Sequence, residues 1–206
     1  MQRTQDGGVA VRIVGLIALF GTLAAFLVLI VLFTFSVSVN GHSMNPTLQP
    51  GDRLVTNFLA RGEVKRFDIV EATEPDSGQH IVKRVIGMPG DRVIVRNPGT
   101  SPQVLVKPAG EDAFLRVDNP TWPDQWGTRV GQMCCERDGK ASERPREFTV
   151  AEDSYWLIGD NWGGSDDSRV FGTVTAGDVG ATMNRRLLPL GGFGTVENRV
   201  RLVPAN

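Results

Sequence analysis

One segment limits what this chain can become more than any other. The residues from Ile13 to Phe35 (IVGLIALFGTLAAFLVLIVLFTF) contain no charged side chain. As a helix they would span about 35 Å at about 1.5 Å per residue, which is enough to cross a hydrocarbon core of about 30 Å. We therefore expect a transmembrane helix over residues 13–35, with the lipid bilayer as one partner of the chain.

The flanks of this segment predict how it crosses. A cleavable secretory signal is an alternative, because Arg3 and Arg12 precede the segment and small residues follow it at 36–38. The apolar segment is longer than the about 7–15 apolar residues of a typical signal peptide, which favours an uncleaved signal-anchor. Because Arg3 and Arg12 outnumber Asp6, the positive-inside rule places residues 1–12 in the cytoplasm and residues 40–206 outside. We predict a single-pass cell-membrane protein with an extracytoplasmic domain.

Charge and composition narrow the classes that remain. The chain has 22 Lys and Arg against 23 Asp and Glu, a formal net charge of −1, so it lacks the cationic field that nucleic-acid binding requires. We expect no nucleic-acid partner. With 24 Gly and 12 Pro, the composition favours a turn-rich β domain over a helical bundle.

The chain has two cysteines, Cys134 and Cys135, and they are adjacent. Neighbouring Cα atoms are only about 3.8 Å apart across a trans peptide, which disfavours an ordinary intrachain bridge. A vicinal disulfide, an intermolecular disulfide and free thiols all stay open, and we favour free thiols.

After the predicted span, short apolar runs alternate with turn residues, as is typical of a mainly β domain. Strands are expected at Arg53–Phe58, Asp68–Ala72, Gln79–Ile86, Arg92–Arg96, Val104–Lys107, Phe148–Val150, Tyr155–Ile158 and Val179–Met183. The sequence Pro-Gly-Asp occurs at 50–52 and at 89–91, each time before a predicted strand, and predicts the same turn twice. Residues 97–147 are rich in Gly and Pro and are interpreted as an insert or small lobe.

Three segments could carry chemistry, and the first is SMNPTL at 43–48. It follows the span closely, so a reactive group there would work at the membrane surface. Neither Gly-x-Ser-x-Gly nor Ser-x-x-Lys is present, because Asn45 and Pro46 occupy the diagnostic positions. Taken alone, Ser43 is more typical of a turn than of a nucleophile.

The second segment runs from His80 to Asp91. In a strand the side chains alternate, so Lys83 falls between Ile81 and Val85 on one apolar face. One interpretation is an edge-strand lysine that reaches water along its aliphatic stem. The other is a buried amine: burial favours the neutral form, which can act as a general base near neutral pH, whereas an arginine stays protonated.

The third segment, residues 155–169, is an apolar run that leads into a loop rich in hydroxyl and carboxylate groups. Its spacing does not reproduce an EF-hand calcium loop, and we expect no metal site. Asp167 and Arg169 are expected to pair and to hold the loop in shape.

Together the three segments resemble the type I signal peptidases, membrane-bound serine proteases with a Ser-Lys dyad. The resemblance is carried by Ser-Met-x-Pro-Thr-Leu at 43–48 with Gly51-Asp52, by Lys-Arg-Val-Ile-Gly-x-Pro-Gly-Asp at 83–91, and by Gly-Asp-Asn then Ser-x-Asp-Ser-Arg at 159–169. It covers about residues 10–95 and 148–183 and leaves 97–147 as a variable insert. It implies a transmembrane helix followed by a signal-peptidase-like β-rich catalytic domain, without a cofactor.

The resemblance also implies roles for single residues. Ser43 would be the nucleophile and Lys83 the general base that takes its proton. Ser165 would orient the Lys83 amine, while Asp167 and Arg169 would support the loop.

The resemblance extends to the substrate. Met44, Leu48 and Val82 would line shallow apolar pockets for small side chains before the scissile bond. The substrates would be exported preproteins, cut after their signal peptide as they leave the translocation machinery.

Three positions depart from the family pattern. Gly41 stands where many members have a serine that assists the oxyanion hole, so the oxyanion would rest mostly on backbone N–H groups, that of Ser43 first. Trp162 replaces an arginine after Gly-Asp-Asn, and Ile81 replaces a tyrosine of some members. None of these changes the dyad.

Several rival hypotheses remain. A histidine could serve as the base, but His42 and His80 are both expected to face away from the dyad. A tethered β domain without catalysis and a specialised peptidase for one substrate are further alternatives. Self-cleaving repressors of the Ser-Lys group fit poorly, because residues 1–42 leave no room for a DNA-binding module.

Overall fold

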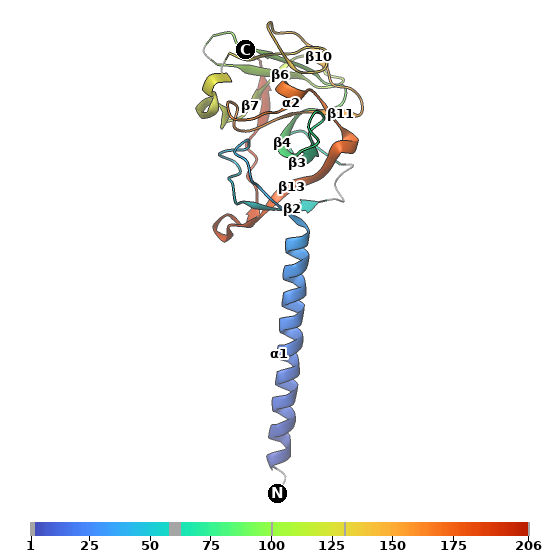
Figure 1. Cartoon of the computed structure of the whole chain (residues 1–206), viewed down its shortest axis with the longest axis vertical. Coiled ribbons are helices and arrows are strands. Elements are labelled where there is room, and N and C mark those ends of the chain that lie inside the picture. Colours follow the sequence, from blue (N-terminus) through green and yellow to red (C-terminus); the bar gives the residue numbers. More distant parts are fainter. Residues whose placement is uncertain (1–2, 58–62, 100, 130, 206) are drawn as a thin grey trace. The chain divides into compact units, whose positions relative to one another are not determined.

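The computed structural model of the chain describes residues 3–57, 63–99, 101–129 and 131–205 (Figure 1). It contains two compact units, Met1–Ser36 and Val37–Asn206. The first is helical and the second is mostly β.

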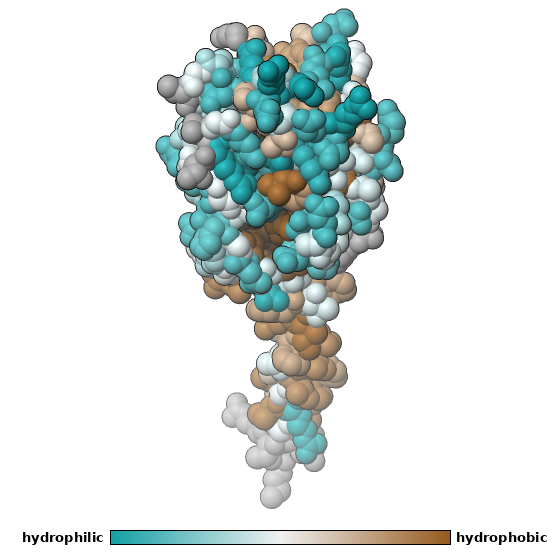
Figure 2. Space-filling view, turned by 45° about the horizontal axis from the view of Figure 1, so that its top comes forward, coloured by the Kyte–Doolittle hydropathy of each residue, from teal (hydrophilic) through white to brown (hydrophobic). Residues whose placement is uncertain are grey.

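The first unit is the helix α1 (Arg3–Thr34). Its segment Gly8–Thr34 has a mean hydropathy of 2.9. Figure 2 shows hydrophobic residues along this helix. By length and composition the helix can cross a membrane, in agreement with the span predicted over residues 13–35.

The second unit consists of two β-sheets (Figure 1). The first has the strand order β1-β2-β13-β3-β4-β11-β12, with β14 paired to β13. Its strands are β1 (Ser36–Ser38), β2 (Arg53–Asn57), β3 (Ile69–Thr73), β4 (His80–Gly87), β11 (Ser154–Ile158), β12 (Val174–Thr175), β13 (Val179–Leu188) and β14 (Gly194–Thr195). The ladders that join β2, β13, β3, β4 and β11 are antiparallel.

The second sheet has the order β15-β7-β6-β5-β8-β9, with β10 paired to β5. Its strands are β5 (Arg92–Arg96), β6 (Gln103–Lys107), β7 (Leu115–Asp118), β8 (Met133–Cys134), β9 (Ala141–Ser142), β10 (Phe148–Thr149) and β15 (Arg201–Pro204). The described helical segments of this unit are short: α2 (Ser168–Phe171), η2 (Trp122–Gln125), η3 (Gly127–Arg129), η4 (Ala176–Asp178) and η5 (Leu190–Gly192).

Each of the eight predicted strands corresponds to a strand of the structure, although Phe58 lies outside the described residues. The prediction ended the last of them at Met183, whereas β13 continues to Leu188. Its polar residues Arg185 and Arg186 pair with Val55 and Leu54 of β2. Pairing with the neighbouring strand therefore outweighs their weak propensity for β-strand. The strands β1, β7, β8, β9, β12, β14 and β15 were not predicted, because they have only two to four residues each.

The two Pro-Gly-Asp turns have the same construction. Gly51 and Gly90 adopt φ values of 93° and 77°, a region that favours glycine. In each turn the aspartate side chain accepts a hydrogen bond from the N–H three residues earlier, at 3.0 Å for Asp52 and 2.7 Å for Asp91. The predicted likeness of these turns is confirmed.

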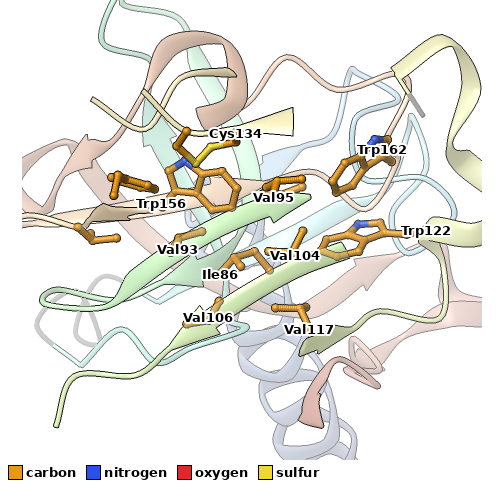
Figure 3. Close-up of a cluster of buried hydrophobic side chains, with 14 of the residues drawn as sticks. Ile86, Val93, Val95, Val104, Val106, Val117, Trp122, Cys134, Trp156 and Trp162 are labelled. Atoms are coloured by element: carbon orange, nitrogen blue, oxygen red, sulfur yellow. A yellow bond between two sulfur atoms is a disulfide. The ribbon is translucent and has the colours of Figure 1, made fainter. Parts of the chain in front are cut away.

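The strand β4 contributes to three hydrophobic clusters. Val85 and Ile81 face one cluster, Ile86 a second and Val82 a third, as the alternation of side chains along the strand requires. The second cluster contains Val93, Val95, Val104, Val106, Val117, Trp122, Trp156 and Trp162 (Figure 3). Since Val104, Val106 and Val117 belong to residues 97–147, the predicted insert is part of the core.

The cysteines correct one expectation. Cys134 and Cys135 are buried and joined as a vicinal disulfide, so the preference for free thiols is wrong. The argument against a bridge assumed a trans peptide, but the peptide between the two residues is cis and their Cα atoms are 3.0 Å apart.

The second Pro-Gly-Asp turn generates a stability prediction. Asp91 is 1% exposed, pairs with Arg66, and accepts hydrogen bonds from the N–H groups of Met88 and Ala109. Replacing Asp91 by Ala leaves these donors without their acceptor, and we expect the free energy of unfolding to fall by about 2–4 kcal/mol. Chemical denaturation of the detergent-solubilised full chain measures this change.

The control is Asp76→Ala, because Asp76 is exposed and pairs with Lys140 at 3.4 Å. It should change the free energy of unfolding by less than about 1 kcal/mol. Equal losses in the two variants would contradict this account of the turn.

Candidate active site

The three motif segments meet at one cleft of the second unit. The cleft has a volume of about 460 Å³ and is lined by residues from 37–44, from 71–83, and by Gly164 and Asp166. Ser43 and Lys83, which are 40 positions apart in the sequence, both belong to this lining. Figure 2 shows a face of this unit on which hydrophobic residues are visible in a hollow between hydrophilic ones.

Ser43 lies in the turn that follows β1 and is partly buried. Its Oγ donates a hydrogen bond to the carbonyl of Val82 at 3.4 Å, which places the hydroxyl against β4 beside Lys83. Two contacts from Asn161 hold the turn: its N–H donates to the Ser43 carbonyl at 3.0 Å and its side-chain amide to the His42 carbonyl at 3.1 Å.

Lys83 is on β4, between β3 and β11, so the edge-strand interpretation is wrong. The residue is 4% exposed, and Ile81 and Val85 flank it on the same face. Burial lowers the pKa of the Lys83 amine below its ordinary value of 10.5, although the nearby carboxylates of Asp167 and two other residues oppose this shift. The surroundings of Lys83 therefore make its amine easier to deprotonate than an exposed lysine.

Asp167 and Arg169 form the expected ion pair. Both side chains are fully buried, with an N–O distance of 2.7 Å, and Asp167 also accepts a hydrogen bond from the Gly159 N–H at 3.1 Å. Burial alone would raise the pKa of Asp167, but the Arg169 guanidinium and the Gly159 N–H hold it below its usual value. The pair keeps the loop folded with its charge compensated.

Ser165 is on the same loop and is fully buried. Its Oγ makes no hydrogen bond of normal geometry to a described residue, but the hydroxyl is near enough to Asp167 to help lower the pKa of that carboxyl. Its two chain neighbours, Gly164 and Asp166, line the cleft. The Ser165 hydroxyl therefore lies beside the Asp167 carboxylate, next to the cleft.

Gly159 is a site residue to which the sequence motif gave no role. A Cβ at this position would clash with Ser165 Oγ and with the Ser43 carbonyl. The absence of a side chain therefore lets the turn that carries Ser43 and the loop that carries Ser165 approach each other. In the sequence, its place in the Gly-Asp-Asn motif is the feature that could have identified Gly159 as a site residue.

A buried network on the other face of β4 fixes the three segments. Arg84 donates to both carboxylate oxygens of Asp160, at 2.8 and 2.6 Å, and the two side chains are 2% and 1% exposed. The Thr47 hydroxyl donates to Asp160 as well, and the Asn119 amide does so at 3.0 Å. One carboxylate thus connects the turn that carries Ser43, the strand that carries Lys83 and the loop after β11.

The residues predicted to line substrate pockets separate into two groups. Met44 and Val82 belong to the cleft lining, and Gly41 does too. Leu48 is 0% exposed and packs in the cluster with Met44 and Leu54, so its position indicates a core role.

The histidines also lie at the cleft. His80 is exposed and its Nδ1 pairs with Glu71 at 2.8 Å. His42 is exposed, and its ring contacts Asn45 at 3.3 Å. The Ser43 hydroxyl instead contacts the Val82 carbonyl.

Comparison with known proteins identifies the family. The family model described as "Signal peptidase, peptidase S26" matches residues 12–188. This chain belongs to the S26 signal peptidase family. It is thus a type I signal peptidase, a serine peptidase whose substrates are signal peptides and which is associated with a membrane.

Two bacterial relatives agree with this assignment. Signal peptidase I of Streptococcus pneumoniae serotype 4 is 34% identical over 181 residues, which cover 80% of this chain and 87% of the relative. Signal peptidase I of Bacillus caldolyticus is 32% identical over 167 residues, covering 79% and 84%. A solved signal peptidase I from Enterococcus faecalis V583 matches 58% of this chain and 95% of its own, with 25% identity and a TM-score of 0.41.

The packing around Gly159 generates a prediction for activity. The variant Gly159→Ala should lose at least about 100-fold in kcat/KM on a preprotein, because displacements of about 1 Å at a reacting group cost that much. Gly191→Ala is the matched control, since a Cβ there meets no atom within 4 Å. A folded Gly159→Ala variant as active as Gly191→Ala would contradict the proposed contact. Cleavage of a labelled preprotein in detergent measures both.

Proposed function

We propose that this chain removes signal peptides from exported preproteins with Ser43 as nucleophile and Lys83 as general base. The observation that carries the proposal is the burial of Lys83 on a central strand, directly beside the residue whose carbonyl accepts the Ser43 hydroxyl. Burial lowers the pKa of an amine because it disfavours the charged form. A buried amine can therefore take a proton near neutral pH.

The proposed reaction begins with attack of Ser43 Oγ on the scissile carbonyl carbon, while Lys83 Nζ takes the hydroxyl proton. The resulting ammonium then protonates the leaving amine, and the signal peptide stays attached to Ser43 as an ester. In the second half, Lys83 Nζ removes a proton from the water that attacks the ester carbon, and the ammonium then returns this proton to Ser43 Oγ as the bond to the signal peptide breaks. Ser165 is proposed to orient the Lys83 amine in both halves.

The oxyanion of both steps is proposed to bind to the Ser43 N–H. No hydrogen bond to another described residue uses this N–H. Gly41 has open space around its Cα and supplies no hydroxyl. A backbone N–H therefore stabilises the negative charge of the oxyanion. Val82 offers an apolar surface in the same cleft for the small side chains before the scissile bond, and Met44, which is 1% exposed, lines the cleft as part of the core.

We propose that α1 is the single membrane span, with its N-terminus in the cytoplasm and the catalytic unit outside. The excess of Arg3 and Arg12 over Asp6 supports this orientation. Because Ser43 follows the end of α1 by only nine positions, substrates would be cut close to the membrane as they leave the translocation machinery.

Substitution of the dyad tests the proposal. Ser43→Ala and Lys83→Ala should each reduce kcat at least about 1,000-fold, because a nucleophile and its base act as one unit. His42→Ala and His80→Ala should keep most of the activity. The assay follows a labelled preprotein with detergent-solubilised enzyme, and folding is checked by circular dichroism. Large loss in a histidine variant, with Lys83→Ala still active, would overturn the assignment.

The pH profile tests the state of the amine. Lys83 acts as a base only when neutral, so activity should fall as acidification protonates it. Since burial lowers the pKa of Lys83 below 10.5, the half-loss should occur below that pH. Measurement of kcat/KM against pH should show one protonation on the acid side, unchanged in His42→Ala and His80→Ala. A midpoint that moves with either histidine would contradict a lysine base.

A further inference from the structure

One segment of the insert, residues 119–132, packs against the loop that carries Ser165. Trp162 of that loop stacks edge-on with Trp122 and Trp126 of the insert, with ring centroids 5.1 and 5.2 Å apart. The Trp162 indole N–H also donates to the Arg129 carbonyl at 3.0 Å. Figure 3 shows Trp122 and Trp162 adjacent at one end of the hydrophobic cluster.

The same segment reaches the buried ion pair of the loop. The Arg169 guanidinium lies 4.1 Å from the centre of the Trp162 ring, a distance typical of a cation–π contact. It also donates to the Gln132 side chain at 3.2 Å. Trp162, which departs from the family pattern, is therefore a bridge between the insert and the loop.

Arg129 makes the most direct contact between the insert and the site. It ends η3 and donates from one terminal nitrogen to the carbonyl of Ser165. Its other terminal nitrogen pairs with Asp166 at 2.5 Å. A single guanidinium therefore holds both the Ser165 backbone and the Asp166 carboxylate, and Asp166 belongs to the cleft lining.

We propose that Arg129 is a positioning residue of the active site, which neutralises Asp166 and fixes the Ser165 backbone so that the Lys83 amine stays available as a base. This inference rests on the proposed role of Lys83. It gives residues 119–132 a function that their composition did not indicate.

The charges around Lys83 explain why the contact matters. Asp167, Asp166 and Glu74 each raise the pKa of Lys83, and Arg169 lowers it. Two of the three carboxylates have an arginine partner: Asp167 pairs with Arg169 and Asp166 with Arg129. The other titratable groups that line the cleft are Glu71, His42 and His80.

Loss of the Arg129 charge would leave Asp166 uncompensated near the amine. The Lys83 ammonium would then be favoured, and the pKa of Lys83 would rise. Since Asp166 is 72% exposed at its side chain, water screens the effect, and we expect a shift of about 0.3–0.7 pH unit.

The experiment measures the lysine directly. The chain has four lysines, so the full-length protein in detergent, labelled with ¹³C at the lysine ε-carbon, should give four titrating NMR signals. The variant Lys83→Met identifies the signal of Lys83. The acid side of the kcat/KM profile is recorded on the same samples.

Arg129→Gln removes the charge but keeps a donor of similar reach. It should raise the pKa of the Lys83 signal by about 0.3–0.7 unit and move the acid side of the activity profile upward by the same amount. Asp166→Asn should lower both the pKa of the Lys83 signal and the midpoint of the acid side of the activity profile. When Asp166→Asn is already present, Arg129→Gln should shift these two values less than it does in the wild type. Arg129→Lys should restore most of the wild-type profile.

Arg146→Gln is the matched control. Arg146 belongs to the same insert and pairs with Glu136 at 3.8 Å, at an exposed position outside the cleft lining. It should leave the Lys83 titration unchanged.

An unchanged Lys83 titration in folded Arg129→Gln, or an equal shift in Arg146→Gln, would overturn the inference. If Arg129→Gln does not fold, the variant Asp166→Asn is the test. An unchanged pKa of Lys83 in Asp166→Asn would show that the Asp166 charge does not act on the amine, and the inference would fail. The proposed function fails separately, if the NMR titration of Lys83 and the acid side of the activity profile do not coincide in the wild type.

Discussion

The buried ion pair between Arg84 and Asp160 is the interaction on which the site depends. Arg84 follows Lys83 directly on β4, so strand alternation places the two side chains on opposite faces. Removal of one partner from a buried pair leaves an uncompensated charge and is strongly destabilising. Since Asp160 also binds Thr47, the pair fixes the serine turn against the lysine strand. The two basic residues have different surroundings: Arg84 is paired with Asp160, whereas burial lowers the pKa of Lys83.

Much of the fold around the site could be predicted from local patterns. Alternation along β4 placed Lys83 with Ile81 and Val85, and the two Pro-Gly-Asp turns were recognised because turn chemistry is local. The central position of β4 was not predictable, because the order of strands is set by contacts between distant segments. Arg84 and Asp160 are 76 positions apart, and no pattern within either segment indicates that they meet.

The insert shows the limit of composition as a guide. Its glycines and prolines indicated a lobe of turns, yet its strands β6, β7, β8 and β9 build most of the second sheet. The valines of β6 lie in the largest hydrophobic cluster, and the tryptophans of η2 and its C-terminal flank contact Trp162. Sequence reasoning recorded Trp162 only as a departure from the family pattern, since its partners come from another part of the chain. The insert thus packs against the loop that carries Ser165 as well as the core.

The most direct test of the central claim is to trap the covalent intermediate. The full-length enzyme in detergent would be mixed with an ester of a short signal-peptide sequence and quenched in acid within one turnover. Mass spectrometry of the digested protein then locates the acyl group. The account predicts an acyl ester on Ser43 in the wild type, and at least about 1,000-fold less in Lys83→Met, which keeps the length of the side chain but has no amine. An acyl group on another residue, or equal acylation of Ser43 without the amine, would contradict it.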